Sequence, residues 1–324
     1  KNIYRASVVY ISVMKKKLKQ YWGMLKETFS QFAADNVTKL SASLAYYTVF
    51  SLGPLLLVVI SVTGFFFREN EVMWEVYWQL EDLVGKNSAD QLFSIIKSLR
   101  DQNAQTFSII GIGILIFGAT TVFADIQDSI NYIWSIKAKP QRGWLKYLKN
   151  RLLSFSLVLG IAFLLIVSLF VSSVVDLLSN SLLSALKDEL VIVIQAINFL
   201  FTFIVITLLF ATIYKVLPDA VIKWKDATRG AFFTGLLFML GKYLISLYIS
   251  SSEMDNTYGA AASIIIILSW VYYTAIILYF GAEFTKVYAM QVGGKIRLND
   301  NAVFIQKKET EKMLSDEVVE LEKK

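Results

Sequence analysis

Long apolar segments alternate with short polar ones along most of this chain. The longest runs from Tyr258 to Tyr288, and its middle part is apolar on every side. A soluble helix needs one polar face, whereas roughly 30 residues at about 1.5 Å each can cross a hydrocarbon core of about 30 Å. The pattern therefore predicts a membrane span, and small residues from Gly259 to Ser263 favour close packing against another helix.

Five further apolar stretches approach the length of a span. The expected spans cover residues 40–67, 106–128, 151–175, 190–217, 229–251 and 259–285. They predict an all-α fold, a polytopic membrane protein with six transmembrane helices in a domain over 40–290. An amphipathic, basic segment (1–39) precedes this domain, and a polar tail (291–324), either a short exposed helix or disordered at its end, follows it.

Two polar segments also show helical periodicity. In 68–105 the repeated apolar residues are Val72, Val76, Leu80 and Leu83, then Leu92, Ile95, Ile96 and Leu99. This predicts two short amphipathic interfacial helices that cap the outer face. The segment 1–39 predicts one or two helices on the membrane surface, with Lys15–Lys19 near anionic headgroups. A simple topology signal is the alternative interpretation of that segment.

The distribution of charge predicts the orientation. Of 32 Lys and Arg residues, 26 fall in four segments, namely 1–39, 137–151, 215–229 and 286–324. Five lie in the alternate loops, and Lys242 lies inside a span. The positive-inside rule then places both termini in the cytoplasm. Basic residues at four separate helix ends do not share one face, which argues against a nucleic-acid-binding protein. No cleavable signal peptide is expected in 1–39.

The composition excludes several kinds of chemistry. The chain contains neither Cys nor His, which rules out disulfides, thiol catalysis and the Ser-His-Asp and Cys-His nucleophile systems. A nuclease needs clustered carboxylates or His near water. Asp125 and Asp128 offer two metal ligands, but no base and no phosphate-binding Gly loop accompany them. We therefore expect no enzyme activity, no cofactor and no metal site.

Polar side chains within the spans are the candidate functional residues, because they are costly in hydrocarbon and usually face the protein interior. Lys242 is the most costly, about 20 Å deep, where insertion costs at least about 2.5–3.5 kcal/mol. Glu283 is its candidate partner, as a functional or a structural buried pair. The full set of cavity candidates is Lys242, Glu283, Asp125, Asp128, Gln195, Asn198, Ser43, Tyr47 and Pro54.

The first span carries a polar stripe at helical spacing, formed by Ser43, Tyr47, Ser51 and Pro54. Pro54 removes one backbone hydrogen bond in mid-span and bends the helix. The stripe is either a hinge or cavity wall, or a static kink that suits packing.

Three carboxylates lie toward the cytoplasmic side. Asp125 and Asp128 are three residues apart, so they share one helical face. With Glu283 they are expected to form an acidic group, unless both aspartates simply reach headgroup water. Gln195 and Asn198 share a face of the fourth span and are expected to face protein or water.

Four stretches carry a family resemblance. They are LSASLAYYTVFSLGPLL (40–56), FGATTVFADIQDSINYIW (117–134), WKDATRGAFFTGLLFMLGKYLISLY (224–248) and YGAAASIIIILSWVYYTAIILYFGAEFTKVYA (258–289). Together they resemble the YihY / virulence factor BrkB family of bacterial inner-membrane proteins, over roughly Phe29 to Met290. One departure is Ala262, where Gly is expected. The resemblance implies a six-span protein of the inner membrane, once labelled ribonuclease BN, and transport of lipid or lipid-like envelope components.

The expected function is therefore a transporter or flippase-like handler of such components, working through an intramembrane polar cavity. The expected partners are membrane lipids, including anionic headgroups, together with oligomer or envelope-protein partners and no nucleic acid. The alternative is a non-transporting scaffold for envelope assembly. A scaffold would tolerate replacement of the polar residues within the spans, but would lose function when 68–105 or 291–324 is changed.

Overall fold

The computed structural model describes residues 2–63, 69–103, 109–138, 189–251, 262–299 and 302–305. The helices of these residues are α1 (Asn2–Ala34), α2 (Val37–Thr63), α3 (Glu69–Val84), α4 (Lys86–Asn103), α5 (Ile109–Ile133), α7 (Glu189–Val216), α8 (Trp224–Ser251) and α10 (Ala262–Gln291). The short strands are β1 (Ile136–Ala138), β2 (Ala220–Val221), β3 (Arg297–Leu298) and β4 (Ala302–Phe304). The expected span 151–175 and the end of the tail, 306–324, lie outside the described residues.

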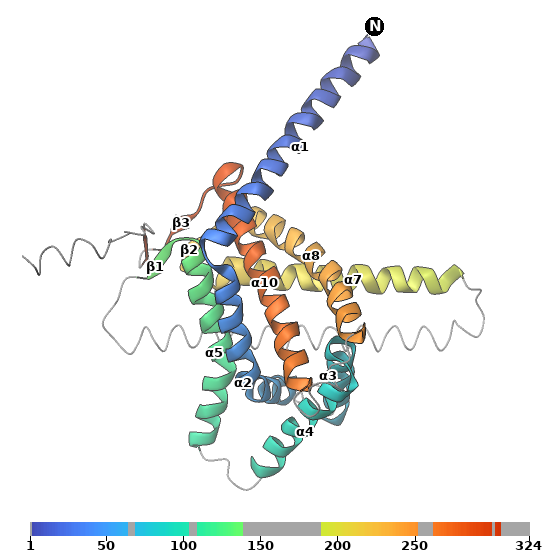
Figure 1. Ribbon diagram of the computed structural model, residues 1–324, viewed down its shortest axis with the longest axis vertical. Coiled ribbons are helices and arrows are strands. Elements are labelled where there is room, and N and C mark those ends of the chain that lie inside the picture. The colour runs from blue at the N-terminus through green and yellow to red at the C-terminus, as the bar shows by residue number, and fades with distance from the viewer. Residues whose placement is uncertain are drawn as a thin grey trace, which may run out of the picture.

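Helix α10 is the centre of the fold. It contacts every other helix among the described residues, and α2 and α5 run alongside each other next to it (Figure 1). The longest apolar stretch of the sequence is thus the helix around which the others pack. Buried side chains of α2, α5, α7, α8 and α10 form the main hydrophobic cluster.

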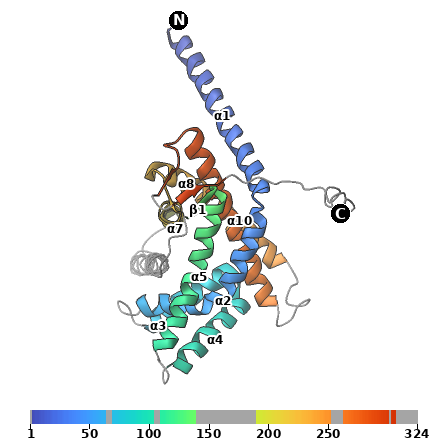
Figure 2. The same ribbon diagram turned by 90° about the vertical axis from the view of Figure 1, so that its left-hand side faces the viewer.

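Different chain segments lie at the two ends of the bundle. All four strands and the junction of α1 with α2 lie at one end, which we call the basic end (Figures 1 and 2). The α3–α4 pair lies at the opposite end, which we call the hairpin end. The segments 69–103 and 136–138 therefore sit at opposite ends, as the expected alternation of loops requires.

The structure agrees with part of the prediction of six transmembrane helices. Two described segments, Phe199–Val216 of α7 and Ile264–Gln291 of α10, are long and apolar enough to cross a membrane by length and composition. Helix α7 lies across α2, α5 and α10, and is seen end-on when they are upright (Figure 2). The mostly helical fold agrees with the prediction, but six parallel spans are not confirmed among the described residues.

Glycines let α8 and α10 approach each other closely. A Cβ atom at Gly230 would overlap the side chain of Thr285, and one at Gly281 would overlap that of Thr234. Residues without a side chain are therefore needed at both places. Two further small residues of α8 are also packed, because Gly235 faces α7 and Ala231 is fully buried. Helix α8 thus lies between α7 and α10.

The hairpin end is closed by apolar contacts. Residues of α3 and α4 pack with Ile60 of α2, while Leu92 of α4 packs with Ile266 and Trp270 of α10. Gly85 joins α3 to α4 with φ of 79°, a backbone conformation that favours glycine. The two predicted amphipathic helices in 68–105 are therefore confirmed as α3 and α4.

Two β-ribbons tie the chain after α10 to earlier loops. Strand β4 pairs antiparallel with β1, and β3 pairs antiparallel with β2. These strands could not be predicted from the sequence, because two or three residues are too few to show an alternating pattern. As a result, the first part of the polar tail is fixed at the basic end.

Candidate functional site: polar groups inside the basic half of the bundle

Ser43, Asp125 and Tyr279 form an interior polar cluster between α2, α5 and α10. The hydroxyl of Ser43 donates a hydrogen bond of 3.2 Å to Oδ1 of Asp125. Oδ2 of Asp125 is buried and makes no hydrogen bond within the described part of the chain. Tyr279 is fully buried, and its hydroxyl oxygen lies near Ser129 without meeting hydrogen-bond geometry. The charges of both Asp125 and Asp128 act on this hydroxyl. The cluster therefore retains unused hydrogen-bonding capacity.

Asp128 lies at the edge of this cluster and is exposed. The charge of Asp219, which follows α7, acts on it. Asp219 is itself tied to α5, because its carboxylate accepts a 2.9 Å hydrogen bond from Nδ2 of Asn131 and its backbone N–H donates to Oδ1 of Asn131. These bonds dock the α7–β2 connection onto α5.

Lys286 connects three parts of the chain, and we call this set of contacts the Lys286 junction. Its Nζ donates a 2.7 Å hydrogen bond to the carbonyl of Ile133 at the end of α5. The same nitrogen lies 3.4 Å from Oε2 of Glu283 and 3.7 Å from Oδ2 of Asp35, in the turn between α1 and α2. Glu283 is fully buried, and its Oε1 makes no hydrogen bond to any described residue. The junction thus joins the ends of α1, α5 and α10.

This geometry corrects two expectations about Glu283. The expected pair with Lys242 is wrong, since Glu283 pairs with Lys286. Lys242 follows Gly241, which packs against Tyr273, ten residues before Glu283 and therefore about 15 Å away along α10. The expected acidic group also divides in two, because the carboxylate near Glu283 is Asp35 rather than Asp125 or Asp128. One turn earlier on α10, Tyr279 faces the two aspartates instead.

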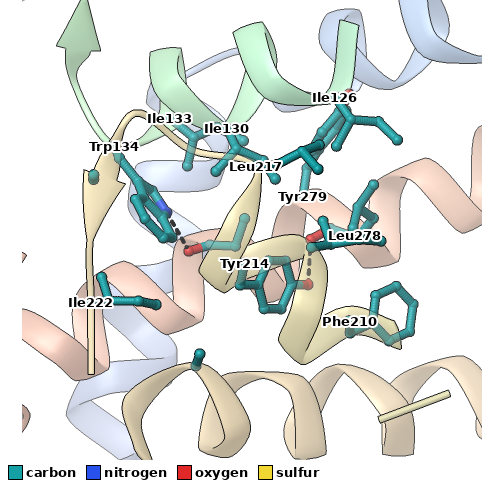
Figure 3. Packing of buried hydrophobic residues seen from close by; sticks show 14 of the residues in the cluster. Ile126, Ile130, Ile133, Trp134, Phe210, Tyr214, Leu217, Ile222, Leu278 and Tyr279 are labelled. Atoms are coloured by element: carbon teal, nitrogen blue, oxygen red, sulfur yellow. Dashed lines mark hydrogen bonds between the residues drawn. The ribbon is translucent and has the colours of Figure 1, made fainter. Parts of the chain in front are cut away.

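Two buried side chains clamp α10 beside these polar groups. The indole Nε1 of Trp134 donates a 3.0 Å hydrogen bond to the carbonyl of Ala282, and the hydroxyl of Tyr214 donates one of 2.8 Å to that of Leu278 (Figure 3). Trp134 follows α5 and Tyr214 belongs to α7, so both helices are fastened to successive turns of α10. Figure 3 shows both bonds within the packed apolar cluster.

The remaining candidates are not brought into these clusters by anything the structure describes. Tyr47 is 41% exposed and contacts the ring of Tyr46. Pro54 lies within α2, which continues as a helix through it, so its role as a hinge stays a prediction. Gln195 and Asn198 lie in α7, but their side chains are outside the described residues. Lys242 is half-buried on α8.

Several residues that are central to these polar clusters were not identified from the sequence alone. The pair of Glu283 with Lys286 has a readable signal, since residues three apart on a helix are neighbours. Asp35, Asn131 and Asp219 have none, because their partners are far away in the chain and only the fold brings them together.

Comparisons with known proteins agree with the geometry of a helical membrane protein. A family described as "Virulence factor BrkB" matches residues 28–304. A UPF0761 membrane protein of Tolumonas auensis is 31% identical over 262 residues, covering 78% of this chain and 80% of that protein. One from Psychromonas ingrahamii is 30% identical over 275 residues, covering 83% and 88%. One from Haemophilus influenzae is 27% identical over 264 residues, covering 79% and 91%. No solved structure matches this chain.

Proposed function

Because the chain belongs to the BrkB family of membrane proteins, we propose that it moves lipid or lipid-like envelope components across the bilayer, through the interior polar cluster. The observation that supports this best is the buried Oδ2 of Asp125, which makes no hydrogen bond to the residues that the structure describes. A polar atom left in this state costs about 1–3 kcal/mol, and more when it is charged. Such intramembrane groups usually serve a ligand or a proton.

The chemistry of the cluster favours groups that donate hydrogen bonds. When it is ionised, Asp125 can only accept hydrogen bonds, whereas the hydroxyls of Ser43 and Tyr279 can donate or accept. An amine or a hydroxyl on a lipid headgroup meets this demand. A phosphate does not fit this cluster, because the neighbouring carboxylates would repel it. The described basic residue that is predicted to lie at mid-span is Lys242. We therefore expect anionic headgroups to bind near Lys242 or at the basic end rather than at Asp125.

The proposal includes the inner membrane with both termini in the cytoplasm, and no enzymatic step. The support is the charge count and the position of the strands at the basic end, opposite to α3 and α4. In this orientation the interior polar cluster lies in the cytoplasmic half of the bilayer.

The test is lipid translocation by purified protein in liposomes. Phosphatidylethanolamine labelled on its acyl chain keeps its amine, and dithionite bleaches only the label in the outer leaflet. Asp125→Asn keeps the shape of the side chain but removes its charge, so we expect translocation to fall at least about tenfold, the equivalent of roughly 1.4 kcal/mol. Glu27→Gln makes the same chemical change on the exposed surface of α1 and should leave the rate unchanged.

A folded protein that translocates no lipid, or an Asp125→Asn variant as fast as the parent, would contradict this proposal. The first result would favour the alternative, a non-transporting scaffold for envelope assembly. That alternative further requires that changes in α3 and α4 abolish function while Asp125→Asn does not.

A further inference from the structure

Helix α1 carries an apolar stripe that nothing in the described structure covers. Its members are strongly exposed, at 74% for Leu18, 66% for Trp22, 62% for Phe29, 56% for Met14 and 49% for Tyr21. Successive residues of a helix are about 100° apart, which places all five within roughly 100° of arc. Figures 1 and 2 show α1 extending beyond the rest of the bundle. We call these five residues the α1 stripe.

The stripe is distinct from the face by which α1 packs on the bundle. Met24 and Thr28 are buried, and Met24 packs in a cluster with Phe284 and Tyr288 of α10. Only Phe29, at the end of the stripe nearest the bundle, contacts a ring of α10, that of Phe280. Most of the exposed apolar surface is therefore additional to the packing that holds α1.

Basic residues line the free edge of the stripe. Lys15, Lys19 and Lys26 are exposed and fall beside it, on the side away from the buried face. Residues 2–26 contain six basic residues and no Asp or Glu. An apolar stripe with Trp and Tyr, bordered by lysines, is typical of a helix that lies in the headgroup region of an anionic leaflet.

We infer that the α1 stripe is a docking surface for an anionic lipid leaflet, with Leu18 and Trp22 in the acyl boundary and the lysines on the headgroups. A second copy of the chain fits less well, because it would bring two helices of high positive charge together without a counter-charge. Helix α1 joins the bundle at the basic end, where α2 begins and α10 ends, so the headgroups of the leaflet at that end would be close to it. The inference does not depend on lipid transport.

The chain offers a direct measurement, since it contains no Cys. An introduced cysteine at Leu18→Cys or Gln20→Cys can carry a polarity-sensitive fluorophore on the full-length protein. Gln20 is exposed and two residues away, hence on the opposite side of α1. The labelled proteins are placed, one copy per disc, in nanodiscs of phosphatidylcholine alone or of phosphatidylcholine with phosphatidylglycerol. Quenching by lipids that carry a quencher on the acyl chain reports insertion.

We expect the label at position 18 to shift to the blue and to be quenched in the anionic discs, while the label at 20 stays in water. Each change among Lys15→Gln, Lys19→Gln and Lys26→Gln should reduce the ratio of embedded to exposed label about fivefold. High salt should do the same. Equal spectra at 18 and 20 in anionic discs would overturn the inference. So would a blue shift at 18 that arises only when two copies share a disc, because the occupant would then be a second copy.

Discussion

Replacement of Lys286 by Met tests whether the Lys286 junction holds the basic end together. The change keeps most of the aliphatic length of the side chain but removes its charge. It leaves Glu283 and Asp35 without this counter-ion and the Ile133 carbonyl without this donor. Removing one member of a fully buried pair costs roughly 3–5 kcal/mol. The side chain of Lys286 is 18% exposed, so water screens part of the loss and we expect about 2–4 kcal/mol.

The free energy of unfolding is measured by denaturation of the purified protein in mixed micelles, followed by circular dichroism. Lys225→Met is the matched control, because Lys225 is exposed in the first turn of α8 and should change stability by less than about 0.5 kcal/mol. Adding Glu283→Gln to Lys286→Met removes the stranded charge, so the double variant should be more stable than the sum of the single changes by about 1 kcal/mol or more. A cost for Lys286→Met below about 1 kcal/mol, or strict additivity, would refute the electrostatic account of the junction.

Two further measurements address packing and ionisation. Gly281→Ala places a methyl group against Thr234 and should destabilise the protein by about 1–3 kcal/mol, whereas Gly23→Ala, with nothing near the new methyl, should not; equal effects would contradict the close approach of α8 to α10. The hydrogen bond from Tyr77 to Asp90 is the main cause that raises the pKa of Tyr77 to about 12, so its contribution to stability is present below pH 10 and is lost as pH rises through 12. Tyr77→Phe should remove one tyrosinate absorbance step near pH 12, and an unchanged titration would contradict this assignment.

The elements with long periodic patterns could be predicted from the sequence. The apolar stretch of α10 and the two amphipathic patterns of α3 and α4 each continue over several turns, so local residue choice decides their structure. The ends of α8 and α10 were predicted less well. Both helices continue past the apolar stretch, to Trp224 and Gln291, because polar residues also support a helix where water is within reach.

The long-range polar contacts could not be predicted. The β1–β4 and β2–β3 ribbons are too short to show a period, and Asn131 meets Asp219 across 88 residues of chain. The partner of Lys242 is a further long-range contact that could not be predicted. The depth of Lys242 stays a prediction; charge alone favours Glu283 as its partner, but the helical rise between Tyr273 and Glu283 excludes that partner.

The structure separates polar residues that hold the fold from those whose place it does not explain. The hydrogen bonds of Asp219 and Trp134 fix connections or helices, and a loss of stability accounts for both residues. Asp125 and Tyr279 lie further in, are connected to neighbouring helices, and still have buried atoms that bond to nothing in the described residues. Fold stability alone gives no reason to keep such atoms in hydrocarbon, because apolar groups of the same shape cost less. The argument for a transported group therefore rests on these two residues rather than on Lys242 and Glu283.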